Sequence, residues 1–228
     1  MRDVRLKRAV IAAALFTALL WIIQIAGTMM ALRLELLGVR PGALAGLHGV
    51  LTAPLVHGSF IHLLANTPPL LVLGPAMLYG FPRAARIALP VIWLGSGLGV
   101  WLFAREAIHL GASGLTYGML FFVFLIGVLR RDRPSMALAM IVFFLYGGMI
   151  WGVLPLKPGI SFEYHLFGAL AGIVAAIGLR RRDPLPTRRV YDWETDDPEN
   201  QEQDYLIGGL WRETKEADVR DPGRRNGE

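Results

Sequence analysis

The sequence predicts an all-α integral membrane protein whose body is a bundle of six transmembrane helices. Of the 228 residues, 54% are hydrophobic, and the mean hydropathy is positive, whereas soluble domains of this size are usually less apolar. Residues 1–180 hold 14 basic and 5 acidic side chains, but the remainder holds 9 basic and 13 acidic. An apolar, basic body with an acidic tail indicates a membrane protein. No basic stripe with interleaved aromatic residues points to nucleic acid as a partner.

Six apolar stretches approach the ~20 residues that a helix needs to cross a bilayer. They are residues 9–31, 61–80, 85–104, 113–129, 135–154 and 162–180. The first follows a basic segment, residues 1–8, as a secretory signal would. Its apolar run is longer than the about 7–15 residues of a signal peptide, so we expect a retained first helix.

Lysine and arginine are concentrated in alternate connections between the predicted helices. Basic residues precede the first helix, separate the second from the third and the fourth from the fifth, and follow the sixth. The other connections contain only Arg33 and Arg40, then Arg105, then Lys157. Because such residues stay on the cytoplasmic side, we expect a multi-pass membrane protein with both termini in the cytoplasm.

Two segments outside the spans have distinctive compositions. The first connection, about residues 33–60, is long, and its part 44–56 is too apolar to lie in water. We expect it in the outer leaflet against the bundle, with a purely structural re-entrant segment as the alternative. The tail, 181–228, is charged and rich in proline, so we expect a disordered cytoplasmic segment with one apolar island at 205–211. The predicted domain of six helices is residues 9–180.

Polar residues lie near the outer starts of the second, fourth and sixth predicted helices. They are His62 and Asn66, then Ser113, then His165. Polar groups inside a bilayer are costly and usually functional. Each alone has a structural explanation, since a serine can bond to its own helix and a histidine can lie at the interface. Four at one depth favour a shared site.

The residue types suggest nucleophilic catalysis. Ser113 lies at a helix start, where unpaired backbone N–H groups can bind an oxyanion, and Gly111 and Gly114 permit a tight turn beside it. His62 and Asn66 are four residues apart, so they share one helix face and can add side-chain donors.

Small-residue pairs predict that the fourth and sixth helices pack closely, which would bring His165 within hydrogen-bond distance of Ser113. The pairs are Gly114 with Gly118 and Gly168 with Gly172. No carboxylate lies inside a predicted span, and Glu163 belongs to the loop or first turn before His165. We therefore expect a Ser–His dyad without a third acidic member.

Three segments carry a resemblance to a known family. They are His57–Asn66, Gly111–Gly114 with Tyr117, and Phe162–Gly172. In combination and in order they resemble the three signatures of rhomboid intramembrane serine proteases, and the resemblance covers about residues 9–180.

The resemblance implies a six-helix rhomboid-like bundle with a membrane-associated first loop, which cleaves transmembrane protein substrates without metal or cofactor. Ser113 would attack the scissile carbonyl, His165 would be the general base, and Tyr117 would pack on the His165 ring. His62, Asn66 and the Ser113 amide would form the oxyanion hole. His57 would be an accessory residue, and the fifth helix would be the substrate gate.

Two further expectations concern the surroundings of this site. Many rhomboids carry a Trp-Arg pair in the first loop, but residues 51–55 occupy the corresponding region here, which leaves the anchoring of the loop open. The water needed for hydrolysis would enter a polar site lined by five side chains, namely His57, His62, Asn66, His109 and His165.

Other functions fit less well. A metalloprotease would need a motif such as His-Glu-x-x-His, and an intramembrane aspartyl protease would need two aspartates in its spans; neither is present. A transporter would place polar groups near the membrane centre rather than toward one face. A catalytically silent rhomboid-like protein that binds membrane clients is the alternative, although both Ser113 and His165 are present. The substrate and the oligomeric state are not predicted.

Overall fold

The computed structural model describes residues 2–156 and 159–183, which belong to one compact unit. The long helices are α1 (Arg2–Met29), α3 (Phe60–Gly80), α4 (Pro82–Phe103), α5 (Ser113–Arg130), α6 (Arg133–Tyr146) and α7 (Phe162–Leu179). Short helical turns are η1 (Leu34–Leu37), η2 (Leu44–Gly46), α2 (Gly49–Thr52), η3 (Ala53–Leu55) and η4 (Gly147–Val153). In the described part of the chain, six helical segments are long and apolar enough to cross a membrane. The predicted all-α, six-span class is therefore confirmed.

The observed bounds differ most from the predicted ones at two places. Helix α1 begins at Arg2, because the basic and leucine residues of segment 1–8 are good helix formers and continue the helix beyond its apolar part. The fifth span changes from α-helix to the 3₁₀ turn η4 at Gly147, where two successive glycines weaken the α-helix. The tail from residue 184 onward, with the predicted island at 205–211, lies outside the described residues.

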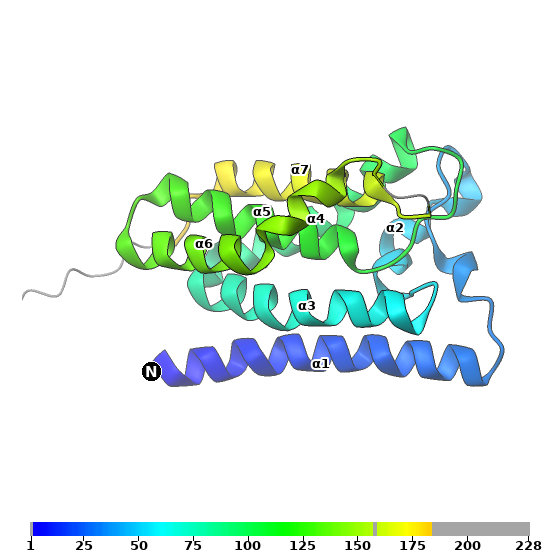
Figure 1. Ribbon diagram of the computed structural model, residues 1–228, viewed down its shortest axis with the longest axis horizontal. Helices are drawn as coiled ribbons and strands as arrows, with labels where there is room; N and C mark the ends of the chain where they lie inside the picture. Colours follow the sequence, from blue (N-terminus) through cyan, green and yellow to red (C-terminus); the bar gives the residue numbers. More distant parts are fainter. Residues whose placement is uncertain (1, 157–158, 184–228) are drawn as a thin grey trace, which may run out of the picture. The chain divides into compact units, whose positions relative to one another are not determined.

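Helix α5 is the most deeply buried of the six spans and forms the centre of the bundle. It packs most closely on α7, where a methyl group at Gly168 would overlap the carbonyl oxygen of Gly114. One turn further, a methyl group at Gly172 would overlap the carbonyl oxygen of Gly118. The two backbones are thus in contact along one face of each helix. Helix α1 lies at the edge of the bundle beside α3 (Figure 1).

The first loop is packed against α4 although it lacks the Trp-Arg pair. The indole N–H of Trp93 donates to the Leu51 carbonyl at 3.1 Å, and that of Trp101 donates to the Ala43 carbonyl at 2.9 Å. Val50 lies directly against the backbone of Gly97. Two tryptophans of α4 therefore anchor this loop from outside its own sequence. Its position in the outer leaflet stays a prediction.

Polar contacts hold the end of the bundle at which α1, α4 and α6 begin, called the basic end below. Asp132 caps α6 by accepting from the Ser135 N–H at 3.0 Å and pairs with Arg130 at 3.0 Å. Burial alone would raise the pKa of Asp132, but these hydrogen bonds and the Arg130 charge hold it below its ordinary value. Asp183 caps α4 by accepting from the N–H groups of Arg83 and Ala84. The carboxylates here neutralise helix starts rather than bind a ligand.

Candidate active site

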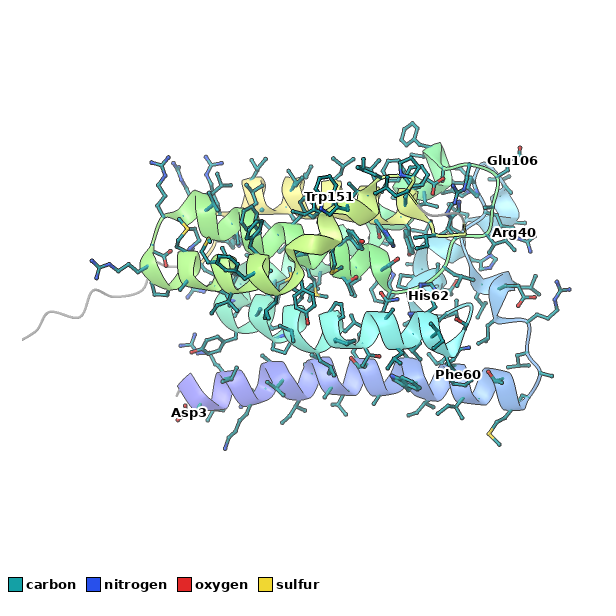
Figure 2. The ribbon with its side chains drawn as sticks, viewed as in Figure 1. Asp3, Arg40, Phe60, His62, Glu106 and Trp151 are labelled. Carbon is teal, nitrogen blue, oxygen red and sulfur yellow. The ribbon has the colours of Figure 1, made fainter. Side chains whose placement is uncertain are left out.

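A pocket of about 630 Å³ opens at the other end of the bundle, where α3, α5 and α7 begin. Ser113 of α5, His165 of α7, and His62 and Asn66 of α3 all line it. Figure 2 marks His62 near the start of α3, toward the loops of this end. The structure thus brings together four polar side chains from three helices that are separated by up to about a hundred residues in sequence.

His165 is held in one orientation and one tautomer by its neighbours. Its Nδ1 lies 2.8 Å from the carbonyl oxygen of Gly152, near the end of η4. Because a carbonyl oxygen only accepts hydrogen bonds, Nδ1 carries the proton, and the neutral ring keeps a lone pair on Nε2. The Tyr117 ring stacks on the imidazole with centroids 4.1 Å apart and planes within 6°. A histidine with free Nε2 can act as a general base.

Ser113 begins α5 after a turn that only glycine fits. Gly111 has φ +114°, a left-handed conformation that side chains disfavour, and its N–H donates to the Ala53 carbonyl at 2.9 Å. A side chain at this position would also meet the His62 ring, whose Cε1 would lie 2.6 Å from the added Cβ. The turn therefore places the start of α5 directly beside the start of α3.

His62 and Asn66 lie one turn apart on α3. The Ser59 hydroxyl caps this helix by accepting from the His62 N–H at 3.1 Å. Asn66 is buried, and its Nδ2 donates to the His62 carbonyl at 3.0 Å. An amide nitrogen has two hydrogens, so one donor remains for a ligand in the pocket. Both side chains line the pocket.

The expected hydrogen bond between Ser113 and His165 is not formed. Both side chains are described and line one pocket, but no hydrogen bond joins them. The close packing of α5 on α7 was correctly inferred. Backbone contact at the glycines sets the distance between the two helices, but it does not fix the side chains of Ser113 and His165 in hydrogen-bond contact. Catalytic hydrogen bonds are often long before substrate binds.

His57 lies outside this pocket, contrary to the expectation that it lines it. It is 2% exposed, its Nε2 accepts from the Ala112 N–H at 3.2 Å, and its ring meets that of His62 at 5.1 Å. Burial, and then the neighbouring His62, lowers the pKa of His57 to about 3. The ring is therefore neutral, and it holds the residue before Ser113 through the Ala112 N–H. His57 precedes α3, so it does not lie on the helix face that carries His62 and Asn66.

His109 is also absent from the pocket. It is 1% exposed, and its Nδ1 contacts the Ser161 hydroxyl at 2.5 Å while its Nε2 contacts the Arg105 carbonyl at 3.1 Å. Its backbone pairs with Val39 of the first loop in an isolated β-bridge. Ser161 caps α7. His109 thus ties three loops together and holds the start of the helix that carries His165.

Comparison with known proteins shows the family to which this chain belongs. A family model described as the rhomboid domain matches residues 44–182, more than half of the chain. The chain belongs to the rhomboid family. It is also similar to mycobacterial proteins over more than two thirds of their length. The uncharacterized protein Rv1337 of Mycobacterium tuberculosis is 40% identical over 171 residues, which are 71% of each chain. The uncharacterized protein ML1171 of Mycobacterium leprae is 34% identical over 193 residues, 80% of this chain and 76% of the relative.

Three residues at the site of this rhomboid protein were not predicted as functional. Gly152 orients His165, and a methyl group there would overlap the Tyr117 hydroxyl. Arg105 pairs with the buried Glu163 at 3.3 Å and donates to the Ile160 carbonyl at 2.9 Å. No motif marks Gly152, a glycine among many in apolar spans. An acidic residue in the first turn of a helix was the available signal for Glu163.

In the residues that the structure describes, no three His, Asp or Glu side chains are grouped so as to hold an ion. The pocket of this rhomboid protein is lined by a serine, a histidine with an oriented tautomer and side chains that can donate hydrogen bonds. These are the components of acyl-transfer chemistry.

Proposed function

We propose that this rhomboid protein is an intramembrane serine endopeptidase that cleaves transmembrane segments of other proteins with a Ser113–His165 dyad. The observation that carries the proposal is the orientation of His165. The Gly152 carbonyl places the imidazole proton on Nδ1 and leaves Nε2 unprotonated in the pocket that Ser113 shares. A serine needs such a base to become a nucleophile.

The reaction proceeds in two halves. Ser113 Oγ attacks the scissile carbonyl carbon and transfers its proton to His165 Nε2, and the carbonyl oxygen takes the negative charge. The Ser113 N–H and the side chains of His62 and Asn66 donate to this oxyanion. His165 then gives the proton to the leaving amine, the C–N bond breaks and an acyl-enzyme remains. His165 then takes a proton from water, whose oxygen attacks the ester carbonyl. The bond to Ser113 Oγ breaks, the proton passes from His165 to Oγ, and the carboxylic acid product leaves.

A dyad suffices because other groups do the work of a third catalytic residue. In a triad, a carboxylate holds the histidine tautomer and stabilises the imidazolium. Here the Gly152 carbonyl holds the tautomer, and the Tyr117 ring fixes the plane. Glu163 is directed to Arg105 instead. The imidazolium gains a polar acceptor but no full negative charge.

A substrate helix would enter between α3 and α6, with α6 as the gate. Within the membrane spans, α6 with η4 is the least buried, and the Tyr146 hydroxyl links it to the Pro68 carbonyl of α3 at 3.1 Å. A gate must open at low cost, and few buried contacts make that possible. Both termini would lie in the cytoplasm, so cleavage would occur near the outer face of a bacterial plasma membrane.

Purified full-length protein tests this proposal with a fluorogenic transmembrane substrate that has a helix-breaking segment near its outer end. We expect Ser113→Ala and His165→Ala to lose detectable cleavage. Asn66→Ala removes one oxyanion donor, so the rate should fall by roughly 10²–10³ and remain measurable. Wild-type cleavage by Ser113→Ala would rule out the mechanism.

A fluorophosphonate probe gives a second measurement that needs no substrate. The probe should label Ser113 in the wild type and fail to label it in His165→Ala, because the base activates the hydroxyl. The alternative function, a silent relative that binds membrane clients, predicts client binding with neither labelling nor cleavage.

A further inference from the structure

A separate cavity of about 480 Å³ lies among the membrane spans, surrounded by α1, α3, α4 and α5. All of its lining residues are apolar, among them Ala12, Phe16, Leu78, Pro90, Trp93 and Met119. The indole N–H of Trp93 is already donated to the first loop. An apolar cavity of this kind does not hold water, so a ligand for it must be apolar where it meets the lining.

The cavity opens between α1 and α4 toward the basic end. Ala12 and Pro90 line it and are exposed, whereas Phe16 and Trp93, one turn deeper on the same helices, close on each other with ring centroids 5.9 Å apart. Residues exposed at this depth of a spanning helix face lipid tails. The medium at the mouth of the cavity is therefore the acyl chains of one leaflet.

The length of the cavity fits one acyl chain. Its lining on α3 runs from Leu70 to Leu78, roughly 12 Å along a helix that rises 1.5 Å per residue. The hydrocarbon of one leaflet is about 15 Å thick, half of a ~30 Å core. A chain in the cavity would supply the dispersion contacts that the facing side chains lack.

Two arginines lie where the phosphate of such a lipid would be. Arg8 precedes Ala12 by one turn of α1, and Arg86 precedes Pro90 by one turn of α4. Helical side chains lean toward the N-terminus, so both guanidinium groups extend from the mouth toward the membrane surface. Both are exposed, and no ion pair or hydrogen bond of either side chain occurs among the described residues.

The Asp183 carboxylate makes Arg83 a poor partner for the phosphate, which leaves Arg8 and Arg86. Arg83 is also at the start of α4, but its backbone N–H donates to the Asp183 carboxylate at 2.9 Å, which would repel an anion beside it. Guanidinium groups bind phosphate oxygens bidentately. Basic pockets between helices at the cytoplasmic face are typical sites for anionic lipid head groups, and the basic end is the face predicted to be cytoplasmic.

We propose that the cavity between α1 and α4 binds one anionic phospholipid, with an acyl chain inside the cavity and the phosphate on Arg8 and Arg86. The chain packs on Met119 of the helix that begins with Ser113. The lipid thereby fills the bundle beside the proposed nucleophile helix. This site does not depend on the proposed protease activity.

Native mass spectrometry of the full-length protein in neutral detergent tests the charge component. Phosphatidylglycerol and phosphatidylcholine with identical chains are added separately, and the bound fraction is measured against lipid concentration. We expect phosphatidylglycerol to bind more tightly. The double variant Arg8→Gln/Arg86→Gln should bind it about 25-fold more weakly, since each basic residue contributes ~1 kcal/mol, about five-fold. Arg131→Gln/Arg133→Gln, which removes two exposed arginines from the same end, is the matched control and should bind normally.

A second variant tests the acyl-chain component. Ala12→Phe places a ring in the mouth of the cavity and should prevent phosphatidylglycerol binding, whereas Ala14→Phe, exposed but outside the cavity, should not. Equal affinity for the two lipids, wild-type affinity of the arginine double variant, or wild-type affinity of Ala12→Phe would each overturn the proposal. Competition by glycerol phosphate as strong as by the lipid would indicate a free-anion site and overturn it too. If Ala12→Phe does not fold, the binding of phosphatidylglycerol by Arg8→Gln/Arg86→Gln, which changes only exposed side chains, tests the proposal.

Discussion

His57 shows how a buried histidine can serve a site without entering it. Its Nε2 accepts the Ala112 N–H, so its proton lies on Nδ1, which has no hydrogen-bond partner among the described residues. Burial and the neighbouring His62 keep the ring neutral by lowering its pKa to about 3. A charged ring would have two N–H groups and would lose the bond that holds the residue before Ser113. The turn before Ser113 therefore keeps its bond to His57 only while the His57 ring is neutral.

This low pKa predicts a pH dependence of stability. As the pH falls below the ordinary value of 6.5, the unfolded chain protonates His57 while the folded chain does not, so folding loses free energy until the pH nears 3. Thermal unfolding of wild type and His57→Gln, which keeps an acceptor but does not titrate, should diverge by on the order of 1–2 kcal/mol between pH 7 and pH 5. If the stability of the two proteins changed with pH in the same way, His57 would bind its proton at the same pH in the folded and the unfolded chain.

The element formed by α6 and η4 combines two tasks. It is the least buried span and the proposed gate, and its last turn presents the Gly152 carbonyl to His165. Movement of this element would therefore change the orientation of the base as well as access to the pocket. Gly152 has to be glycine because the Tyr117 hydroxyl occupies the space of a side chain.

Substitution of this glycine should reduce catalysis. Gly152→Ala displaces Tyr117 and the carbonyl acceptor of His165, and misplacement of a catalytic group by about 1 Å can cost ~10²-fold in rate. The matched control is Gly148→Ala in the same turn, where an added methyl meets nothing within 4 Å. Turnover of the transmembrane substrate at saturating concentration distinguishes the two. Equal rates for both variants would exclude a positioning role of Gly152.

At the scale of the whole molecule, the contact of α5 with α7 affects both the stability of the bundle and the geometry of the pocket. The two helices carry Ser113 and His165 at their starts, and their backbones touch at Gly114 with Gly168 and at Gly118 with Gly172. Arg105 and His109 then hold the first turn of α7 through Glu163 and Ser161. Polar loop contacts and small-residue packing together set the separation of Ser113 and His165.

Widening this contact should therefore destabilise the bundle and impair the site together. In Gly168→Ala the added methyl overlaps the Gly114 carbonyl, and overpacking of this kind costs about 1–3 kcal/mol. Gly178→Ala, on the same helix with open space around it, should be neutral or stabilising by up to ~1 kcal/mol. Thermal unfolding in detergent measures the difference. A Gly168→Ala protein as stable as Gly178→Ala would mean that the helices separate without cost.

Much of the architecture was predictable because its signals are local. Each span is a continuous apolar run, so their number and order followed from the chain alone and are confirmed by the structure. The glycine spacing on the fourth and sixth spans indicated their contact for the same reason. The catalytic roles of Ser113 and His165 stay predictions, although the structure places both in one pocket.

The sequence by itself determined the membrane class, the six spans and the family, because apolar length and short motifs are properties of neighbouring residues. Only the tertiary structure decided which of the five histidines share a pocket and what orients the base. His57 and His109 lie close in sequence to His62 and Ser113, yet they support the site from outside. The Gly152 carbonyl that holds His165 has no side chain to reveal it. Such contacts depend on how helices rotate and cross, which is set by packing between residues far apart in the chain.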